Sequence, residues 1–283
     1  MAARITSRSN PLVRRVRQLG AEPAARKEER AFIAEGVRLV EEALAARSTI
    51  EEILHSPRLA LTERGRKLLG RLRTDGLRLV ETTDSVLDSI SDAETSQGIL
   101  AIVHSPPAIS LSGSGALSGS QAEARQSATV PVFWVVGWGL QDPGNVGALL
   151  RTADAAGADL FLTLAGTADP TSPKAVRASA GSIFRMQIAG GLAADEILEA
   201  AASRGVRLFG TDPSSGVPYS EADYAGPIGF VFGCEGEGLP QAVAGRLHGI
   251  VTIPMREGVE SLNVVAAAAV VLFEAARRRR GPG

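Results

Sequence analysis

The 283-residue chain contains a single cysteine, Cys234, which excludes an internal disulfide and any metal site built on a cluster of cysteines. It also lacks a long apolar run, because the longest one near the C-terminus, Val264–Phe273, is too short to span a bilayer. Its first residues carry no apolar segment of the kind found in secretory signals, so we expect a cytoplasmic protein without membrane association. An apolar content of 45% is nevertheless ample for a buried core, which excludes a chain that is disordered throughout.

The common nucleotide-binding signatures are missing as well. The sequence contains neither GxxxxGK[ST] nor a GxGxxG that opens a helix. The three histidines, His55, His104 and His248, are scattered along the chain and do not have the spacing of metal ligands. We therefore expect no P-loop, no dinucleotide fingerprint and no metal.

Positive charge is concentrated at the front of the chain. Residues 1–80 hold 17 Lys and Arg against 10 Asp and Glu, a net charge of +7, although the whole chain has a net charge of −1. This asymmetry indicates a polyanionic partner, with nucleic acid as the first candidate, while a solvated helix surface explains the charge equally well. Arg14, Arg15 and Arg17, on the first predicted helix, are the candidate RNA-binding residues.

A segment rich in serine and glycine divides the chain. Residues 106–129 hold six Ser and three Gly without a sustained apolar period, which is typical of a flexible linker. Residues 1–105 are predicted to form a small α/β domain that begins with a helix capped by Ser9 or Asn10. Residues 130–283 alternate between strand and helix patterns, which predicts a parallel sheet covered on both faces.

Ligands of such sheets bind beyond the carboxyl ends of the strands, so the loops that follow strands are the places to inspect. The first of these loops turns through residues 142–144 into a helix that Asn145 is expected to cap and that carries Arg151. The second places Gly233, Gly236 and Gly238 around two glutamates, and such glycines let a ligand approach the backbone. The third joins a strand to the C-terminal helix. Each loop alone is compatible with an ordinary turn.

Together the three loops resemble the three sequence motifs of the SpoU branch of the SPOUT methyltransferases, which methylate ribose 2′-oxygens of RNA with S-adenosylmethionine. Residues 172–185 are similar to the segment that joins the first two motifs in this family, and the front domain more weakly resembles its ribosomal-protein-like substrate-binding domain. The matching residues are Asn145-Val146-Gly147 and Arg151 in the first motif, Gly233, Glu235, Gly236, Gly238 and Leu239 in the second, and Ile253-Pro254-Met255 with Ser261-Leu262-Asn263 in the third.

The resemblance implies a trefoil knot that forms the cofactor pocket, and a homodimer with the active site at the subunit interface. It implies that Arg151 binds the target phosphate and helps to deprotonate the ribose hydroxyl. Because a guanidinium group stays protonated, electrostatic stabilisation of the forming alkoxide is the alternative. By position, the resemblance assigns cofactor binding to Gly233, Glu235, Gly238, Ile253, Leu262 and Asn263, and catalysis to Arg151, Asn145, Glu235, Ser261 and Asn263.

Several functions stay open at this point. The front domain favours ribosomal RNA over transfer RNA as the substrate, but relatives use both. A methyltransferase that acts on a base is a further alternative, although the Asn and Arg of the first motif favour ribose. The chain could also be an RNA-binding or ribosome-assembly factor without catalysis. Cys234 is expected to be a small packing residue.

Overall fold

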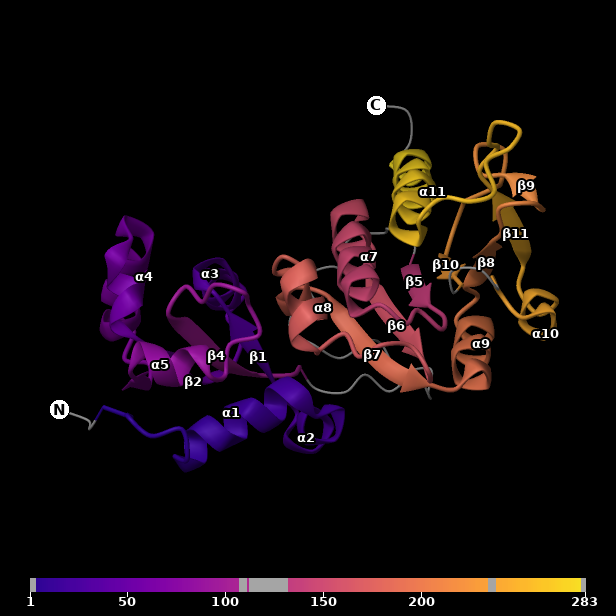
Figure 1. Ribbon diagram of the computed structural model, residues 1–283. Helices are drawn as coiled ribbons and strands as arrows, with labels where there is room; N and C mark the ends of the chain where they lie inside the picture. Colours follow the sequence, from indigo (N-terminus) through magenta and orange to yellow (C-terminus); the bar gives the residue numbers. More distant parts are fainter. Residues whose placement is uncertain (1–3, 107–110, 112–131, 234–237, 281–283) are drawn as a thin grey trace. The chain divides into compact units, whose positions relative to one another are not determined.

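A computed structural model of the chain describes residues 4–106, 111, 132–233 and 238–280 (Figure 1). These residues form two compact units. The first unit comprises residues 4–106 together with residues 169–185, and the remaining described residues form the second unit. The division differs from the predicted one, which placed residues 169–185 in the C-terminal domain. Most of the predicted linker lies outside the described residues.

The first unit has a four-stranded mixed sheet with the order β1-β4-β2-β3. Strand β4 is antiparallel to both of its neighbours, and β2 and β3 are parallel. Its elements are α1 (Pro11–Ala21), α2 (Pro23–Glu29), β1 (Ala31–Glu35), α3 (Val37–Ala45), β2 (Ile50–His55), η1 (Pro57–Leu61), α4 (Glu63–Thr74), β3 (Leu79–Glu81), α5 (Asp84–Asp88), β4 (Ile99–His104), α8 (Pro173–Ala178) and η2 (Ser182–Phe184).

Helix α1 begins where the sequence predicts. The Asn10 side chain accepts a hydrogen bond from the backbone N–H of Leu12 (2.9 Å), and a proline occupies the first helical position. Val13, Val16 and Leu19 recur at helical spacing and are buried. This apolar face packs on the sheet, so the arginines between these residues are directed elsewhere.

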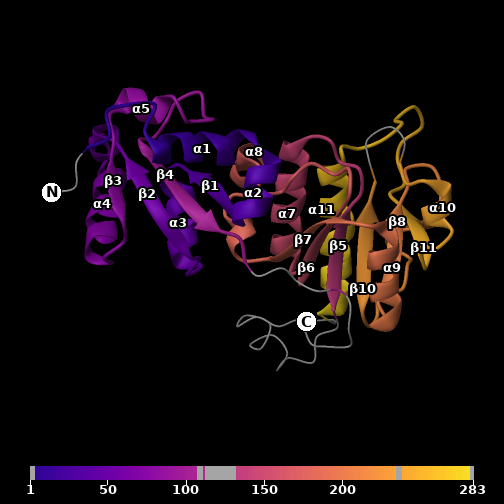
Figure 2. The same ribbon diagram turned by 90° about the horizontal axis from the view of Figure 1, so that it is seen from below.

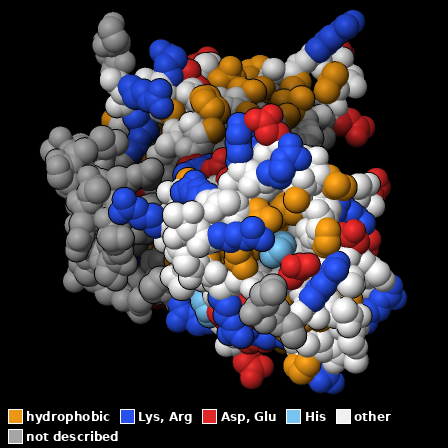
Figure 3. Space-filling view, turned by 90° about the vertical axis from the view of Figure 1, so that its left-hand side faces the viewer, with side chains coloured by type: hydrophobic (Ala, Val, Ile, Leu, Met, Phe, Trp, Pro, Cys, Tyr) orange, Lys and Arg blue, Asp and Glu red, His pale blue; other side chains and the backbone are white. Residues whose placement is uncertain are grey.

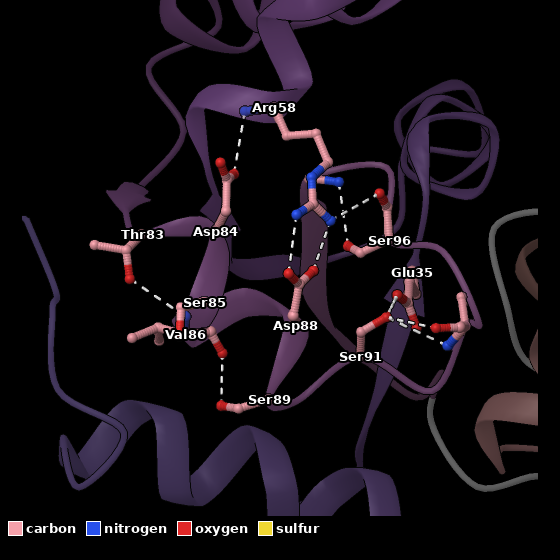
Figure 4. A network of polar contacts seen from close by, with 12 residues as sticks. Glu35, Arg58, Thr83, Asp84, Ser85, Val86, Asp88, Ser89, Ser91 and Ser96 are labelled. Carbon is pink, nitrogen blue, oxygen red and sulfur yellow. Dashed lines mark hydrogen bonds and ion pairs between the residues drawn. The ribbon is translucent and has the colours of Figure 1, made fainter.

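Arg58 organises a polar network on the α5 side of the sheet (Figure 4). Its two Nη groups donate to the two carboxylate oxygens of Asp88 (2.6 and 2.9 Å), and its backbone N–H donates to Asp84 (3.3 Å). One Nη also donates to the carbonyl of Ser96 (3.4 Å). These contacts tie η1 to α5 and to the turn before β4. The Arg58 guanidinium is therefore engaged in charge-assisted hydrogen bonds that stabilise the fold.

We expect His55 to give the first unit a pH-dependent stability. It lies buried at the end of β2, and burial lowers its pKa because the charged imidazole is the disfavoured form. The unfolded chain therefore binds the proton more readily, and the free energy of unfolding falls as pH drops through the usual histidine range of about 6.5. Urea unfolding at pH 7.5 and pH 5.5 should show a larger loss for the wild type than for His55→Gln. Equal losses would contradict the assignment.

The second unit has a seven-stranded sheet in which every pairing is parallel, with the order β7-β6-β5-β10-β8-β11-β9. The predicted α/β class with a parallel sheet is thereby confirmed, while the trefoil knot stays a prediction. The elements are β5 (Phe133–Gly137), α7 (Pro143–Ala156), β6 (Leu160–Leu164), β7 (Gln187–Leu192), α9 (Ala194–Ser203), β8 (Arg207–Thr211), β9 (Val217–Pro218), β10 (Ile228–Phe232), α10 (Gln241–Ala244), β11 (Gly249–Thr252) and α11 (Val264–Arg279).

Helices cover this sheet on both faces (Figure 2). Helices α7 and α11 pack against each other. Helix α7 also packs against β5, and α11 packs against β10. Helix α9 packs on β8 and contributes Ile197 to the core that surrounds Trp134, which is completely buried. None of the helices in the described part of the chain combines the length and apolarity needed to cross a membrane.

Two arginines near the C-terminus hold the end of α11 in place. Arg278 donates to the carbonyl of Ala222 (3.0 Å), and Arg279 donates to the carbonyls of Val132 (3.2 Å) and Gly226 (3.3 Å). The Arg279 guanidinium also lies over the ring of Phe133, with 4.9 Å between its central carbon and the ring centroid. These side chains therefore serve packing, although a run of four arginines in a sequence is typical of a nucleic-acid contact.

Candidate active site

A cavity of about 310 Å³ lies at the carboxyl ends of β8, β10 and β11, beside the start of α11. This is the edge of the sheet where the sequence predicts a ligand, and the volume is in the range of small-molecule sites. The lining is largely apolar side chains and backbone, with one carboxylate. It consists of Thr211, Asp212, Pro213, Ser214, Phe232, Gly233, Gly238, Val251, Ile253, Met255, Ser261, Leu262, Val264, Ala267 and Val271.

Gly233, directly after β10, has no space for a side chain. A Cβ atom at this position would lie 2.6 Å from the carbonyl oxygen of Gly238 and 3.0 Å from the backbone nitrogen of Leu239. Gly238 has a φ of +63°, a conformation that favours glycine. The two glycines therefore let two backbone segments approach closely at the wall of the cavity.

Asp212 shapes the loop after β8. One of its carboxylate oxygens accepts four hydrogen bonds, from the backbone N–H and the hydroxyl of both Ser214 and Ser215 (2.8–3.0 Å). Partial burial works to raise the pKa of Asp212, but these hydrogen bonds outweigh it and the pKa is lowered. The loop is thus held by an ionised carboxylate, and Thr252 ties it to β11 by donating to the carbonyl of Pro213 (3.3 Å).

The loop between β5 and α7 leads into the first motif, whose matching residues lie in α7, and it is held by its neighbours. The Thr167 hydroxyl accepts from the backbone N–H of Gly139 (3.0 Å) and donates to the carbonyl of Gly137 (3.2 Å). The backbone N–H of Ala168 donates to the carbonyl of Leu140 (2.8 Å). The segment that follows β6 therefore fixes the path by which the chain enters α7.

The expectation that Asn145 caps α7 is wrong. The N-cap is Asp142, whose carboxylate accepts from the backbone N–H of Gly144 (2.8 Å), and Pro143 is the first helical residue. Asn145 lies half-buried within the first turn. Arg151 is exposed on the same helix, and among the described residues none forms an ion pair with it. Since α7 packs against α11, the helix with Arg151 and the helix beside the cavity are neighbours.

The structure brings many of the predicted site residues together. The cavity is lined by Gly233, Gly238, Ile253, Ser261 and Leu262. Asn263 is the N-cap of α11, where its side chain accepts from the backbone N–H of Val265 (2.9 Å).

Other predicted residues are not placed at the cavity. Asn145 and Arg151 are not among the residues that line it. Glu235 lies outside the described residues, as do Cys234 and Gly236. Sequence reasoning missed residues 211–214, although a loop directly after a strand was a usable signal.

The three arginines of α1 differ in their surroundings. Arg15 donates to both carboxylate oxygens of Glu51 (2.5 and 2.8 Å) and to Glu29 (2.6 Å). The hydrogen bonds to Glu51 raise the pKa of Arg15, and Arg15 in turn lowers the pKa of Glu51. Arg14 and Arg17 are exposed, and no hydrogen bond or ion pair links either of them to another described side chain.

Comparison with known proteins gives consistent matches over both units. The model of the SpoU rRNA methylase family matches residues 133–273, and that of the MRM3-like substrate binding domain matches residues 10–101. The 23S rRNA (guanosine(2553)-2′-O)-methyltransferase RlmP of Bacillus subtilis is 30% identical over 242 residues, which are 86% of this chain and 87% of that protein.

Two similar solved structures contain AdoMet, that is, S-adenosylmethionine. The rRNA methyltransferase from Sinorhizobium meliloti has a TM-score of 0.79 at 28% identity and covers 98% of each chain. The SpoU methyltransferase AviRb from Streptomyces viridochromogenes has a TM-score of 0.80 at 25% identity and covers 96% of this chain and all of that one. The predicted family and cofactor are thereby confirmed. The chain belongs to the SpoU rRNA methylase family of S-adenosylmethionine-dependent RNA 2′-O-methyltransferases.

Proposed function

We propose that this protein methylates a ribose 2′-hydroxyl in ribosomal RNA. The observation that carries the proposal is the cavity at the ends of β8, β10 and β11, which gathers residues of the second and third motifs. Ribosomal RNA is favoured because the first unit matches a substrate-binding domain and the Bacillus subtilis relative is named for 23S rRNA.

The cavity fits the cofactor. Its apolar lining suits an uncharged purine, and the closely approaching backbone at Gly233 and Gly238 offers amide groups without side chains in the way. Bound S-adenosylmethionine supplies a methyl group on a sulfonium sulfur. Gly233, Gly238, Ile253 and Leu262 are proposed to hold it, with Glu235 and Asn263 completing the set.

Arg151 is proposed to act on the RNA side of the reaction. Its guanidinium would hold the target phosphate and stabilise the negative charge that develops on the ribose 2′-oxygen. Asn145, Glu235, Ser261 and Asn263 are proposed to position these groups, and positioning supplies much of the rate of an in-line transfer.

The proposed activity is tested by incubating RNA with the protein and S-adenosylmethionine, followed by nuclease digestion and mass spectrometry. The expected product is a 2′-O-methyl nucleoside in ribosomal RNA. The same modification should be missing from the ribosomal RNA of cells that lack the gene. A methylated base, or methylation confined to transfer RNA, would contradict the proposal. RNA binding without any transfer would favour the assembly factor instead.

We expect Arg14 and Arg17 to contact RNA phosphates. Both are exposed on α1, and residues 1–80 hold more Lys and Arg than Asp and Glu. Figure 3 shows Lys and Arg side chains spread over the face in view, with Asp and Glu among them. Each lost phosphate contact lowers the slope of log affinity against log salt by about 0.7–0.9. Anisotropy titrations at several salt concentrations should therefore show a slope smaller by roughly 1.4–1.8 for the double variant Arg14→Gln/Arg17→Gln.

The matched control for this double variant is Arg207→Gln/Arg246→Gln. Both of these arginines lie in the second unit and pair with aspartates. Their loss should leave the salt dependence unchanged. If the α1 variant also keeps the wild-type slope, the basic face of α1 is only a solvated surface.

A homodimer is the expected assembly, and α11 offers the surface for it. Val270 and Phe273 are 36% and 49% exposed and, at helical spacing, form an apolar strip on one face of this helix. Introducing a charge by Phe273→Glu should weaken dimerisation by at least about tenfold, since it leaves a carboxylate in an apolar interface. Analytical ultracentrifugation measures this, with Val217→Glu, equally exposed at 49% on β9, as the control. A fully active wild-type monomer would refute the dimer.

A further inference from the structure

The connection between β6 and β7 is built into the first unit. Residues 169–185 cluster with residues 4–106, although they lie between two strands of the second unit. Helix α8 packs against β1, and the ring of Phe184 stacks on that of Phe32 with 5.9 Å between centroids and 20° between planes. Val176 and Ile183 are buried. The first unit is therefore completed by a segment that follows it by more than sixty residues.

An ion pair formed by a buried arginine marks the point where the chain enters this unit. The Arg26 side chain is only 4% exposed, and its Nε donates to the carboxylate of Asp169 (2.8 Å). One Nη donates to the carbonyls of Leu19 (2.8 Å) and Gly20 (3.2 Å) in the last turn of α1. A buried charge is stable only when it is paired and hydrogen-bonded, and Arg26 meets both conditions.

The rest of the segment is attached by weaker contacts. Arg177 pairs with Asp92 (2.6 Å), whose backbone N–H donates to the carboxylate of Glu35 (3.0 Å) in the network of Figure 4. Arg185 pairs with Glu42 (2.6 Å) at the far end. These pairs are more exposed than that of Arg26, so each contributes less to holding the segment.

The residues just before Asp169 contact the loop that leads into α7. Thr167 and Ala168 hydrogen-bond to the loop at residues 137–140, which leads into α7 with Asn145 and Arg151. Asp169 is the next residue, and its carboxylate is held by Arg26. Asp169 is thus bonded directly to Ala168, which contacts the loop that leads into α7, while its own carboxylate contacts Arg26 on α2.

We infer that Arg26 and Asp169 are positioning residues for methyl transfer. Their ion pair fixes the place where the chain passes from the loop beside the first motif into the unit that carries α1. A change at this pair therefore acts through the chain on Thr167 and Ala168, which hold the loop that leads into α7 and Arg151. The inference rests on the proposed function, and it adds two residues that touch neither cofactor nor reacting atoms.

Asp169→Asn is the sharpest test. Asparagine keeps the shape of the side chain and one oxygen for the hydrogen bonds from the N–H (2.7 Å) and hydroxyl (2.5 Å) of Thr171, but it removes the charge that Arg26 meets. The matched control is Asp195→Asn, which breaks an exposed ion pair with Arg246 in the second unit. Arg26→Gln and Arg26→Lys complete the set.

Turnover per folded enzyme at saturating RNA and S-adenosylmethionine should fall about 10–100-fold for Asp169→Asn and Arg26→Gln, because a misplacement near 1 Å has effects of this size. Both dissociation constants should stay within about twofold of wild type, and Arg26→Lys should recover part of the turnover. Combining Asp169→Asn with Arg26→Gln should cost no more than the worse single change. The Asp195→Asn control should match wild type.

A lower melting temperature with unchanged turnover per folded enzyme would reduce the pair to a stabilising contact and overturn the inference. The inference is also overturned if the double variant loses turnover by the product of the two single losses, as independent effects would. Failure of the proposed function looks different, because the wild type itself would then methylate no RNA, and the inference would fall with it.

Discussion

Replacing Arg151 with alanine is expected to lower methyl transfer by about 10²–10³-fold or more while the dissociation constant for S-adenosylmethionine stays within about twofold. Arg151 projects from α7, is exposed, and is not among the residues that line the cavity. Its loss therefore removes an interaction made in the transition state and leaves the cofactor contacts intact. Calorimetry with S-adenosylmethionine measures the cofactor affinity, and a tritium-transfer assay with RNA measures methyl transfer.

Arg151→Lys is expected to lower methyl transfer nearly as much as Arg151→Ala. An ammonium group is a point charge, and it cannot replace a planar fork that holds a phosphate and a hydroxyl together. Near-normal transfer by Arg151→Ala would return this arginine to an ordinary surface position and remove the proposed mechanism.

Gly233→Ala should have the opposite signature, with loss of cofactor binding. The added Cβ would lie 2.6 Å from the Gly238 oxygen and 2.7 Å from its carbonyl carbon, and these are backbone atoms that cannot rotate away. The loop must shift, and it forms part of the cavity wall. We expect the dissociation constant for S-adenosylmethionine to rise at least about 100-fold, equivalent to roughly 2.7 kcal/mol.

Gly245→Ala is the control for this substitution, because its Cβ would meet its nearest neighbour, the Gln241 oxygen, at an ordinary 3.5 Å. RNA affinity should be unaffected in both variants, since neither glycine is among the predicted RNA-contacting residues Arg14, Arg17 and Arg151. Tight cofactor binding by Gly233→Ala would mean that the ligand sits away from this cavity.

Local signals in the sequence were sufficient for much of the fold. Asn10 followed by a proline predicted the start of α1, and alternating strand and helix patterns predicted the parallel sheet. The same rule could have corrected the start of α7. Asp142 and Asn145 are both good capping residues, but Pro143 belongs at the first helical position, which selects Asp142 as the cap.

Long-range pairing could not be read from the sequence. Arg15 is indistinguishable from Arg14 and Arg17 in a sequence, and only the approach of Glu51 on β2 shows that its charge is compensated. Arg26 and Asp169 are separated by 143 positions, so no periodicity links them. For the site, the motif residues were assigned through the resemblance to a family, whereas residues 211–214 belong to no motif and only their position at the end of β8 pointed to the cavity.

The discontinuous first unit also sets an order of events during translation. When residue 106 leaves the ribosome, the face of β1 that will meet α8 and the ring of Phe184 still has no partner. At about 5–20 residues per second, the roughly 80 further residues need about 4–16 s. Strands β5 and β6 and helix α7 emerge during that interval. The N-terminal part of the chain is therefore made first but finished late, and its exposed apolar strand is the segment that a nascent-chain chaperone would meet.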